Sequence, residues 1–161
     1  VTDAFNIDLK GIHERFYRLI CKGQLAPVMN NIRRIAASGA HLEVTNLIIP
    51  RENDSDEDIA ELIAFVASVS DRIPLHFSAY HPDYKLRREY TSEGTLLRAQ
   101  QLARAKLKYV YLGNIGINER NDTHCPDCGY LLVTRAGFRA SVVGLSGGNC
   151  SACGAKSDIR A

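Results

Sequence analysis

Two short cysteine motifs near the end of the sequence restrict its fold more than any other feature. CPDCG carries Cys125 and Cys128, and CSACG carries Cys150 and Cys153. Each Cys-x-x-Cys can form a tight knuckle, and two knuckles supply the four thiolates of one tetrahedral site. We therefore predict that these four cysteines bind one metal ion, a structural zinc, with iron as the alternative metal. A pair of redox dithiols or a chance spacing is the competing interpretation.

The residues around these motifs predict a small β module. The 21 residues between Cys128 and Cys150 fit a hairpin. We expect its strands at Leu131–Thr134 and Phe138–Val143, with a turn at Arg135–Gly137. From Asn118 onward Asn, Asp and Gly become frequent and helical periodicity stops, so we predict a domain boundary near residue 118 and a four-cysteine, zinc-ribbon-like module over residues 119–161.

Residues 1–118 alternate strand-like and helix-like segments, a pattern typical of an α/β domain with a parallel sheet. A capping box from Ser55 to Asp58 marks one helix start, and Gly39 marks one helix end. The expected strands are Ala4–Leu9, Leu42–Ile49, Leu75–Tyr80 and Tyr109–Leu112, and the expected helices are Pro27–Ser38, a helix from Ser55 and one near Ser92–Ala105.

Each predicted strand keeps one polar face, because side chains alternate along a strand. A parallel strand that is buried on both faces would be almost entirely apolar, so we expect the sheet to enclose a polar ligand. In such folds ligands bind at the carboxyl ends of the strands. The polar residues at or near these ends are Asp8, Lys10, Thr45, Asn46, Tyr80 and His81.

Two of these features could serve the fold itself instead of binding a ligand. Asp8 and Lys10 could hold an amino-acid-like ligand, or they could form a simple surface ion pair. His81 could contact a ligand, or it could be hydrogen-bonded within the fold.

The overall composition excludes several classes of protein. With 161 residues, 45% of them hydrophobic, and a net charge of only +2, the chain does not imply a strongly electrostatic partner such as bulk nucleic acid. No apolar run approaches the ~20 residues needed to cross a bilayer. Five cysteines without a secretory signal favour a reducing compartment, so we expect a cytoplasmic protein. Cys21 is expected to be a small buried residue.

Several segments, taken in order, carry a resemblance to a known family. NIDLKG, EVTNLIIPRENDS, HFSAYHPDYKL, KYVYLGN and then CPDCG and CSACG resemble the C-terminal part of the AmmeMemoRadiSam-system radical SAM enzymes. These enzymes are relatives of the pyruvate formate-lyase activating enzymes. The resemblance covers nearly the whole chain. It implies that residues 1–118 are the C-terminal half of a (β/α)6-type radical SAM partial barrel, followed by a cysteine-rich tail.

The resemblance also assigns roles to residues. In the activating-enzyme relatives an Asp-x-Lys strand helps to hold S-adenosylmethionine and an associated cation, and its positions match Asp8 and Lys10. A histidine near the nucleoside matches His81. Thr45 stands where these relatives carry an arginine near the ligand, and we carry over Thr45 and its neighbour Asn46 as further contacts.

The sequence departs from the family in two ways. Arg51 replaces the glycine of a Pro-Gly turn, so the resemblance does not imply the family's backbone geometry at this turn. Radical SAM chemistry also needs a Cys-x3-Cys-x2-Cys loop for a [4Fe-4S] cluster, and no such spacing exists in this sequence. Because the chain begins at Val1 and enters a strand-like run at once, we expect a fragment of a longer protein, with the cluster ligands upstream.

The resemblance therefore implies an enzyme fragment that is inactive alone. The complete enzyme would cleave S-adenosylmethionine reductively and use the 5′-deoxyadenosyl radical to abstract hydrogen from an unidentified substrate, with a protein as one candidate. The alternative is a zinc-ribbon binding module that contacts nucleic acid or a protein partner. Asp127 and Asp158 partly offset the positive charge of this module. It also lacks a series of aromatic side chains on which nucleic-acid bases could stack, so nucleic acid is the less favoured partner.

Overall fold

The computed structural model describes residues 2–115, 121–137 and 139–159. The chain divides into two compact units, Val1–Ile115 and Gly116–Ala161. The boundary that the sequence predicts near residue 118 lies outside the described residues. None of the helices in the described ranges is both long and apolar enough to cross a lipid bilayer.

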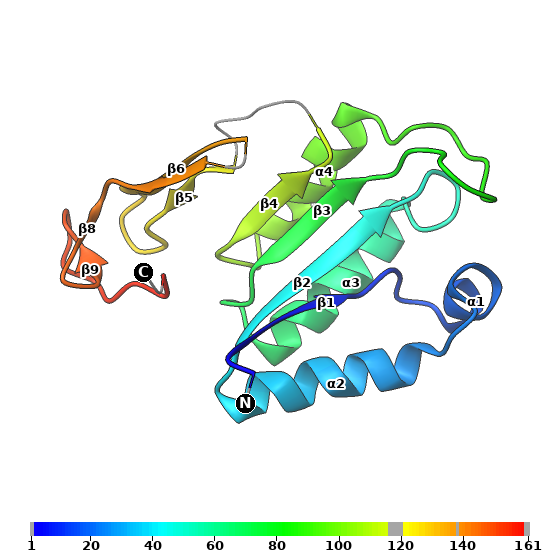
Figure 1. Ribbon diagram of the computed structural model, residues 1–161, viewed down its shortest axis with the longest axis horizontal. Coiled ribbons are helices and arrows are strands. Elements are labelled where there is room, and N and C mark those ends of the chain that lie inside the picture. Colours follow the sequence, from blue (N-terminus) through cyan, green and yellow to red (C-terminus); the bar gives the residue numbers. More distant parts are fainter. Residues whose placement is uncertain (1, 116–120, 138, 160–161) are drawn as a thin grey trace. The chain divides into compact units, whose positions relative to one another are not determined.

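The first unit is built on a sheet of four parallel strands in the order β1-β2-β3-β4 (Figure 1). The strands are β1 (Ala4–Asp8), β2 (His41–Ile48), β3 (Leu75–Ala79) and β4 (Val110–Gly113). The helices α2 (Leu25–Ser38), α3 (Asp56–Val69) and α4 (Glu93–Arg104) connect them, preceded by α1 (Glu14–Phe16) and the π-helical turn η1 (Tyr17–Cys21). The prediction of an α/β domain with a parallel sheet is confirmed.

Local signals in the sequence explain where the helices begin and end. The hydroxyl of Ser55 accepts a hydrogen bond of 3.1 Å from the backbone N–H of Asp58, so the predicted capping box starts α3. Ser92 caps α4 in the same way through the N–H of Thr95. Gly39 ends α2 with a φ of 80°, a left-handed conformation that glycine adopts without strain.

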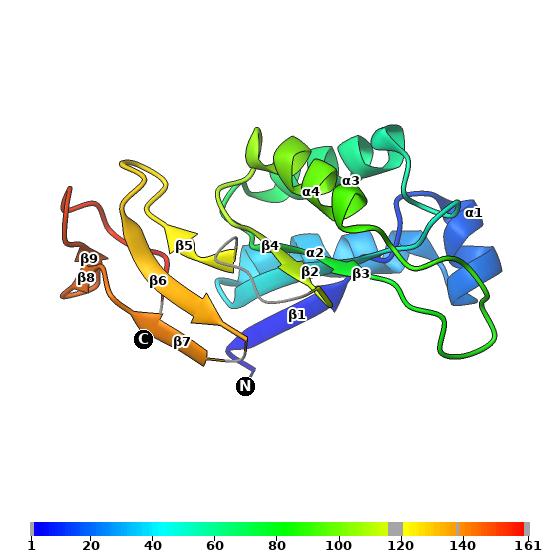
Figure 2. The same cartoon turned by 90° about the horizontal axis from the view of Figure 1, so that it is seen from above.

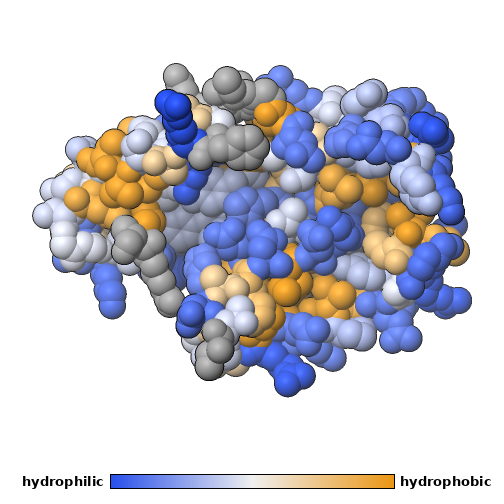
Figure 3. Space-filling model, viewed as in Figure 1, coloured by the Kyte–Doolittle hydropathy of each residue, from blue (hydrophilic) through white to orange (hydrophobic). Residues whose placement is uncertain are grey.

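The two faces of the sheet differ in burial. Leu42, Val44 and Ile48 of β2 alternate with half-exposed neighbours, and Leu75 and Phe77 of β3 do the same. The buried set faces the helices, of which α3 and α4 cover one side of the sheet in Figure 2. Each fully buried side chain of this size stabilises the fold by about 1.5–3 kcal/mol. Neither α3 nor α4 lies on the opposite face, called the open face below, where hydrophilic residues lie among apolar patches (Figure 3).

One expectation about the first unit is wrong. Cys21, expected to be buried, is exposed. The short α1 and η1 turns bury Phe16 and Tyr17, and this orientation leaves Cys21 at the solvent side of the last turn. Lys22 then ends the turn with a φ of 55°.

The second unit is a small β module. It contains a three-stranded antiparallel sheet of β5 (Thr123–His124), β6 (Leu131–Ala136) and β7 (Arg139–Val142), and a second pair of β8 (Leu145–Ser146) and β9 (Asn149–Cys150). Its buried hydrophobic residues in the described ranges are only Cys125, Leu132, Val133 and Cys150. So small an apolar core stabilises a fold only weakly without a further cross-link or metal.

The predicted hairpin exists, but its predicted turn is wrong. Arg135 and Ala136 continue β6 and pair with Ala140 and Arg139. The connection is therefore shorter than the expected turn at Arg135–Gly137 and begins at Gly137, which has a φ of 59°. The start of the second strand, predicted at Phe138, lies outside the described residues.

Candidate functional site

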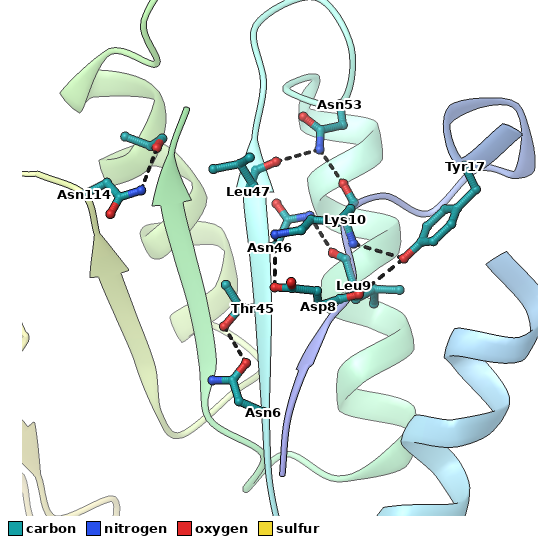
Figure 4. Close-up of polar contacts among 11 residues, drawn as sticks. Asn6, Asp8, Leu9, Lys10, Tyr17, Thr45, Asn46, Leu47, Asn53 and Asn114 are labelled. Atoms are coloured by element: carbon teal, nitrogen blue, oxygen red, sulfur yellow. Dashed lines mark hydrogen bonds and ion pairs between the residues drawn. The ribbon is translucent and has the colours of Figure 1, made fainter. Parts of the chain in front are cut away.

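Asp8 and Lys10 lie at the carboxyl end of β1 and contact each other. The Lys10 Nζ atom is 3.0 Å from Asp8 Oδ1 (Figure 4), and 59% of the Asp8 side chain is exposed. An ion pair this exposed contributes at most about 1 kcal/mol to stability. The pair is therefore a weak structural element, and both charges remain accessible to a ligand.

Asn53 fixes the backbone on which Lys10 stands. Its Oδ1 atom accepts a hydrogen bond of 2.6 Å from the N–H of Ile49. Its Nδ2 group donates to the carbonyl oxygens of Lys10 at 2.6 Å and Leu47 at 2.9 Å. Asn53 is only 6% exposed, so the end of β1 is tied to the end of β2 through a buried amide. The sequence analysis did not identify this residue, because nothing local distinguishes it from other turn asparagines.

Two more side chains hold the same stretch of backbone. The buried Asn46, predicted as a ligand contact, donates from Nδ2 to the carbonyl oxygen of Leu9 at 2.8 Å. The hydroxyl of Tyr17 accepts from the N–H of Lys10 at 3.1 Å and donates to the carbonyl oxygen of Asp8 at 3.4 Å. Burial raises the pKa of Tyr17, which keeps its hydroxyl protonated as a donor. The structure thus places Asn46 on the helix-covered face as a support for the strand end.

Thr45 and His81 have different surroundings. Thr45 pairs with Asp8 across the parallel ladder and therefore shares the open face, where its hydroxyl donates to Asn6 Oδ1 at 2.9 Å. His81 follows β3, and its Nδ1 atom lies 3.1 Å from Asp83 Oδ2. The structure brings Asp8, Lys10 and Thr45 to one face, while the His81 ring is directed to Asp83.

Tyr80, the remaining polar residue predicted near a strand end, is buried. Its N–H donates to Thr91 Oγ1 at 2.9 Å, and its hydroxyl donates to the carbonyl oxygen of Leu86 at 2.6 Å. These bonds anchor the segment after β3 and leave the hydroxyl pointing into the fold.

The turn after β2 accommodates Arg51 in place of glycine by adopting a left-handed backbone. Arg51 has a φ of 65°, and its N–H donates to Asp54 Oδ1 at 2.7 Å. Its guanidinium forms an ion pair with Glu89. A non-glycine residue in this region is uncommon, and the contacts around Arg51 offset its conformational cost.

The four cysteines of the second unit converge. The Sγ atoms of Cys125 and Cys153 are 3.8 Å apart, those of Cys128 and Cys150 are 3.7 Å apart, and all four lie within 4.8 Å of one another. Four sulfur atoms held about 2.3 Å from a central zinc at tetrahedral angles are about 3.8 Å apart. A disulfide would require a separation of about 2.0 Å. These cysteines could therefore bind one metal ion.

The two knuckles have equivalent backbone geometry. The N–H of Gly129 donates to the carbonyl oxygen of Cys125 at 2.9 Å, and that of Gly154 donates to Cys150 at 2.8 Å. Both glycines have positive φ angles, 74° and 76°, so the chain can turn beneath the sulfur atoms. The glycine after each second cysteine is thus needed for the turn.

The acid–base properties of the cysteines fit a cation at their centre. The backbone N–H of Cys153 lowers the pKa of Cys150 to about 7. The backbone N–H of Tyr130 lowers the pKa of Cys128, but the neighbouring thiols, that of Cys153 first, outweigh it and raise this pKa to about 12. Four adjacent thiols cannot all ionise unless a positive ion compensates their charge.

A separate polar cluster lies on the open face at β2, β3 and β4. Glu43 accepts hydrogen bonds from His41 Nε2 at 3.1 Å and from His76 Nε2 at 3.0 Å. The hydrogen bond from His76 is the main cause that lowers the pKa of Glu43 to about 2. The rings of His76 and Tyr111 are 5.2 Å apart at an angle of 33°. The sequence alone did not predict that Glu43 and His76 meet.

We expect the Glu43 carboxylate to make the fold sensitive to acid. Its folded-state pKa of about 2 lies below its ordinary value of 4.5. Its contribution is therefore complete above pH 4.5 and is lost as the pH falls toward 2. Because a third of the side chain is exposed, we expect about 1 kcal/mol rather than the ~3 kcal/mol of an unscreened shift.

Unfolding of the wild type and of Glu43→Gln, measured by denaturant at a series of pH values, checks this expectation. The stability difference between them should shrink by about 1 kcal/mol over that acid range. A difference that stays constant down to the lowest pH would contradict it. Glu57→Gln, an exposed carboxylate in the first turn of α3, is the control.

The fold and the cysteine site define an α/β domain joined to a module that can bind a metal, and comparisons with known proteins agree with the first part. The fold of this chain is similar to the crystal structure of a domain of pyruvate-formate lyase-activating enzyme from Bacteroides vulgatus. The TM-score is 0.62 at 22% sequence identity, and the match covers 70% of this chain and 68% of that chain.

In sequence, the chain is 44% identical over 163 residues to the uncharacterized protein MJ0808 of Methanocaldococcus jannaschii. The match includes 98% of this chain but 49% of that protein, so the chain spans about half the length of the curated relative it matches. No protein-family model matches the chain.

Proposed function

We propose that this chain is the C-terminal part of a radical SAM enzyme of the AmmeMemoRadiSam type, and that the open face of its sheet binds S-adenosylmethionine. One observation carries the proposal: Asp8 and Lys10 stand paired and accessible at the carboxyl end of a parallel strand. The similarity in fold to an activating-enzyme domain supports it. On this proposal the four strands are the C-terminal part of a (β/α)6-type partial barrel.

The residues at the strand end have chemistry that suits this ligand. The Lys10 ammonium can bind the carboxylate of S-adenosylmethionine in a charge-assisted hydrogen bond, and Asp8 can bind its amine or an associated cation. Thr45 offers a hydroxyl on the same face. The buried amides of Asn46 and Asn53 hold the backbone of Leu9 and Lys10 in position, so the site is organised before the ligand arrives.

On this proposal the chain does not itself bind the catalytic iron–sulfur cluster. When bound, a [4Fe-4S] cluster supplies the electron that cleaves S-adenosylmethionine to methionine and a 5′-deoxyadenosyl radical, which abstracts hydrogen from a substrate. The sequence has no Cys-x3-Cys-x2-Cys loop, and Cys21 stands apart from the other four cysteines. On this proposal the cluster ligands come from outside this chain, which binds and orients the cosubstrate.

We assign a structural zinc to the four cysteines of the second unit. The fit of the sulfur separations to a tetrahedral zinc thiolate supports the assignment. All four positions are thiolates, so no coordination site stays open for a reactant, as is usual for structural rather than catalytic zinc.

The test of the proposed function is the binding of S-adenosylmethionine to the full-length enzyme with and without Lys10→Ala. Loss of one charge-assisted hydrogen bond should weaken binding by about 1–3 kcal/mol, measured by isothermal titration calorimetry. Lys106→Ala, which removes an exposed lysine after α4, should leave the affinity unchanged. Equal affinities in wild type and Lys10→Ala would leave Asp8 and Lys10 as a simple surface ion pair.

A further inference from the structure

Lys10 lies beyond the regular part of β1, and side chains hold its main chain. The ladder between β1 and β2 ends at the pair of Asp8 and Thr45. The carbonyl oxygen of Lys10 accepts a hydrogen bond from Asn53 at 2.6 Å, and its N–H donates to the Tyr17 hydroxyl at 3.1 Å (Figure 4). The placement of this lysine therefore depends on an amide and a phenol, and not on a neighbouring strand.

The Tyr17 hydroxyl satisfies main-chain groups at the edge of the sheet. On the inner side of β1, the N–H of Leu9 donates to the carbonyl oxygen of Thr45 at 2.9 Å. Main-chain groups of successive residues point to opposite sides of a strand, so the C=O of Asp8 and the N–H of Lys10 point away from β2. The hydroxyl accepts from Lys10 and donates to Asp8 at 3.4 Å. One side chain thus bonds both groups that an adjacent strand would otherwise bond.

The turn that carries Tyr17 packs directly on the chain after Lys10. The side chains of Phe16 and Tyr17 are buried, with exposed fractions of 7% and 4%. A Cβ atom at Gly11 would lie only 2.6 Å from Phe16 Cδ1, whereas non-bonded carbon atoms prefer about 3.5–4.0 Å. Glycine at this position therefore allows the Phe16 ring to contact the main chain, and this contact holds Tyr17 beside the strand end.

From these contacts we infer that Tyr17 is a positioning residue of the proposed S-adenosylmethionine site. Its hydroxyl fixes the main chain of Asp8 and Lys10, so the two charged side chains meet the ligand in one arrangement instead of several. Tyr17 acts through these two residues and not through a contact of its own with the ligand. The inference rests on the proposed function, and it adds the α1–η1 turn to the elements that determine the affinity of the site.

Amide hydrogen exchange at Lys10 tests the anchor in the absence of any ligand. Tyr17→Phe keeps the ring but removes the hydroxyl, so the Lys10 N–H loses its acceptor. In the full-length enzyme, studied by mass spectrometry, we expect this amide to exchange about tenfold faster or more than in the wild type. Tyr130→Phe removes a hydroxyl from an exposed ring of the second unit and should leave the rate unchanged. Equal rates in Tyr17→Phe and the wild type would overturn the inference.

The affinity of the full-length enzyme for S-adenosylmethionine, measured by calorimetry, tests whether the anchor serves the site. We expect Tyr17→Phe to weaken binding about fivefold, the scale of one hydrogen bond. Because the hydroxyl acts through Lys10, the same substitution should weaken binding less than about twofold in a Lys10→Ala background. A purely structural role predicts the same loss in both backgrounds. That result, or an unchanged affinity of the single variant, would refute a positioning role.

A second variant changes the position of the turn and retains the hydroxyl. Gly11→Ala places a methyl group against the Phe16 ring, so it should speed exchange at Lys10 and weaken ligand binding as Tyr17→Phe does. Wild-type values of both quantities in Gly11→Ala would contradict the role of the turn. If the wild-type enzyme does not bind S-adenosylmethionine, the proposed function fails, whereas the exchange rate at Lys10 still decides whether Tyr17 anchors the strand end.

Discussion

Replacement of Cys128 by serine should remove the bound metal and unfold residues 121–159, while the parallel sheet remains intact. The second unit has few buried apolar residues, so most of its folding free energy must come from the metal. In small zinc modules that contribution is of the order of 10 kcal/mol. We therefore expect one zinc per wild-type chain and close to none in Cys128→Ser.

Elemental analysis of protein purified without added metal measures the first effect, and amide NMR spectra measure the second. Cys21→Ser is the matched control, because Cys21 is a free, exposed thiol outside the site. It should retain the metal and both sets of resonances. A wild-type metal content near zero with intact thiols, or a folded and fully metallated Cys128→Ser, would refute the assignment.

Asn53→Asp should produce the largest destabilisation of the first unit. The new carboxylate keeps the acceptor for the N–H of Ile49, but it loses the two donors to Lys10 and Leu47 and faces their carbonyl oxygens instead. A buried charge without a partner, or a buried acid that must protonate, costs several kcal/mol. We expect a loss of about 3 kcal/mol or more in the free energy of unfolding.

Denaturant unfolding followed by far-UV circular dichroism measures this loss, since every described helix belongs to the first unit. Asn30→Asp makes the same chemical change at an exposed position of α2, where the side chain contacts Arg33, and should alter stability by less than about 0.5 kcal/mol. Equal stability of Asn53→Asp and the wild type would show that the buried amide does not hold the strand ends.

The elements of the fold could be predicted because their signals are local. Alternation of polar and apolar residues predicted the strands. The Ser55 capping box marked the start of α3, and Gly39 marked the end of α2. The spacing of the cysteines likewise predicted which four side chains would converge. Cys21 was misjudged, because burial at the last turn of a short helix depends on which residues that turn packs inward.

The supports of the candidate site could not be predicted in the same way. Asn53 and Lys10 are 43 positions apart in the sequence. Their contact depends on how β1 and β2 align in the sheet, which no local pattern specifies. Asn46 was placed among the ligand contacts on the basis of its position in the sequence, although strand alternation turns it toward the helices. The contact between Glu43 and His76 likewise depends on how β2 and β3 align, which a sequence pattern does not specify.

The exposed cysteine on the π-helical turn is a suitable attachment point for a spectroscopic probe. Cys21 ends the turn that begins with Tyr17, whose hydroxyl contacts the main chain of both Asp8 and Lys10. With a metal bound, the other four thiols are coordinated, so a thiol-reactive dye should label Cys21 selectively. A fluorophore at this position would respond to movements of the turn, and occupancy of the strand end could then be followed in real time without a radioactive or enzymatic assay.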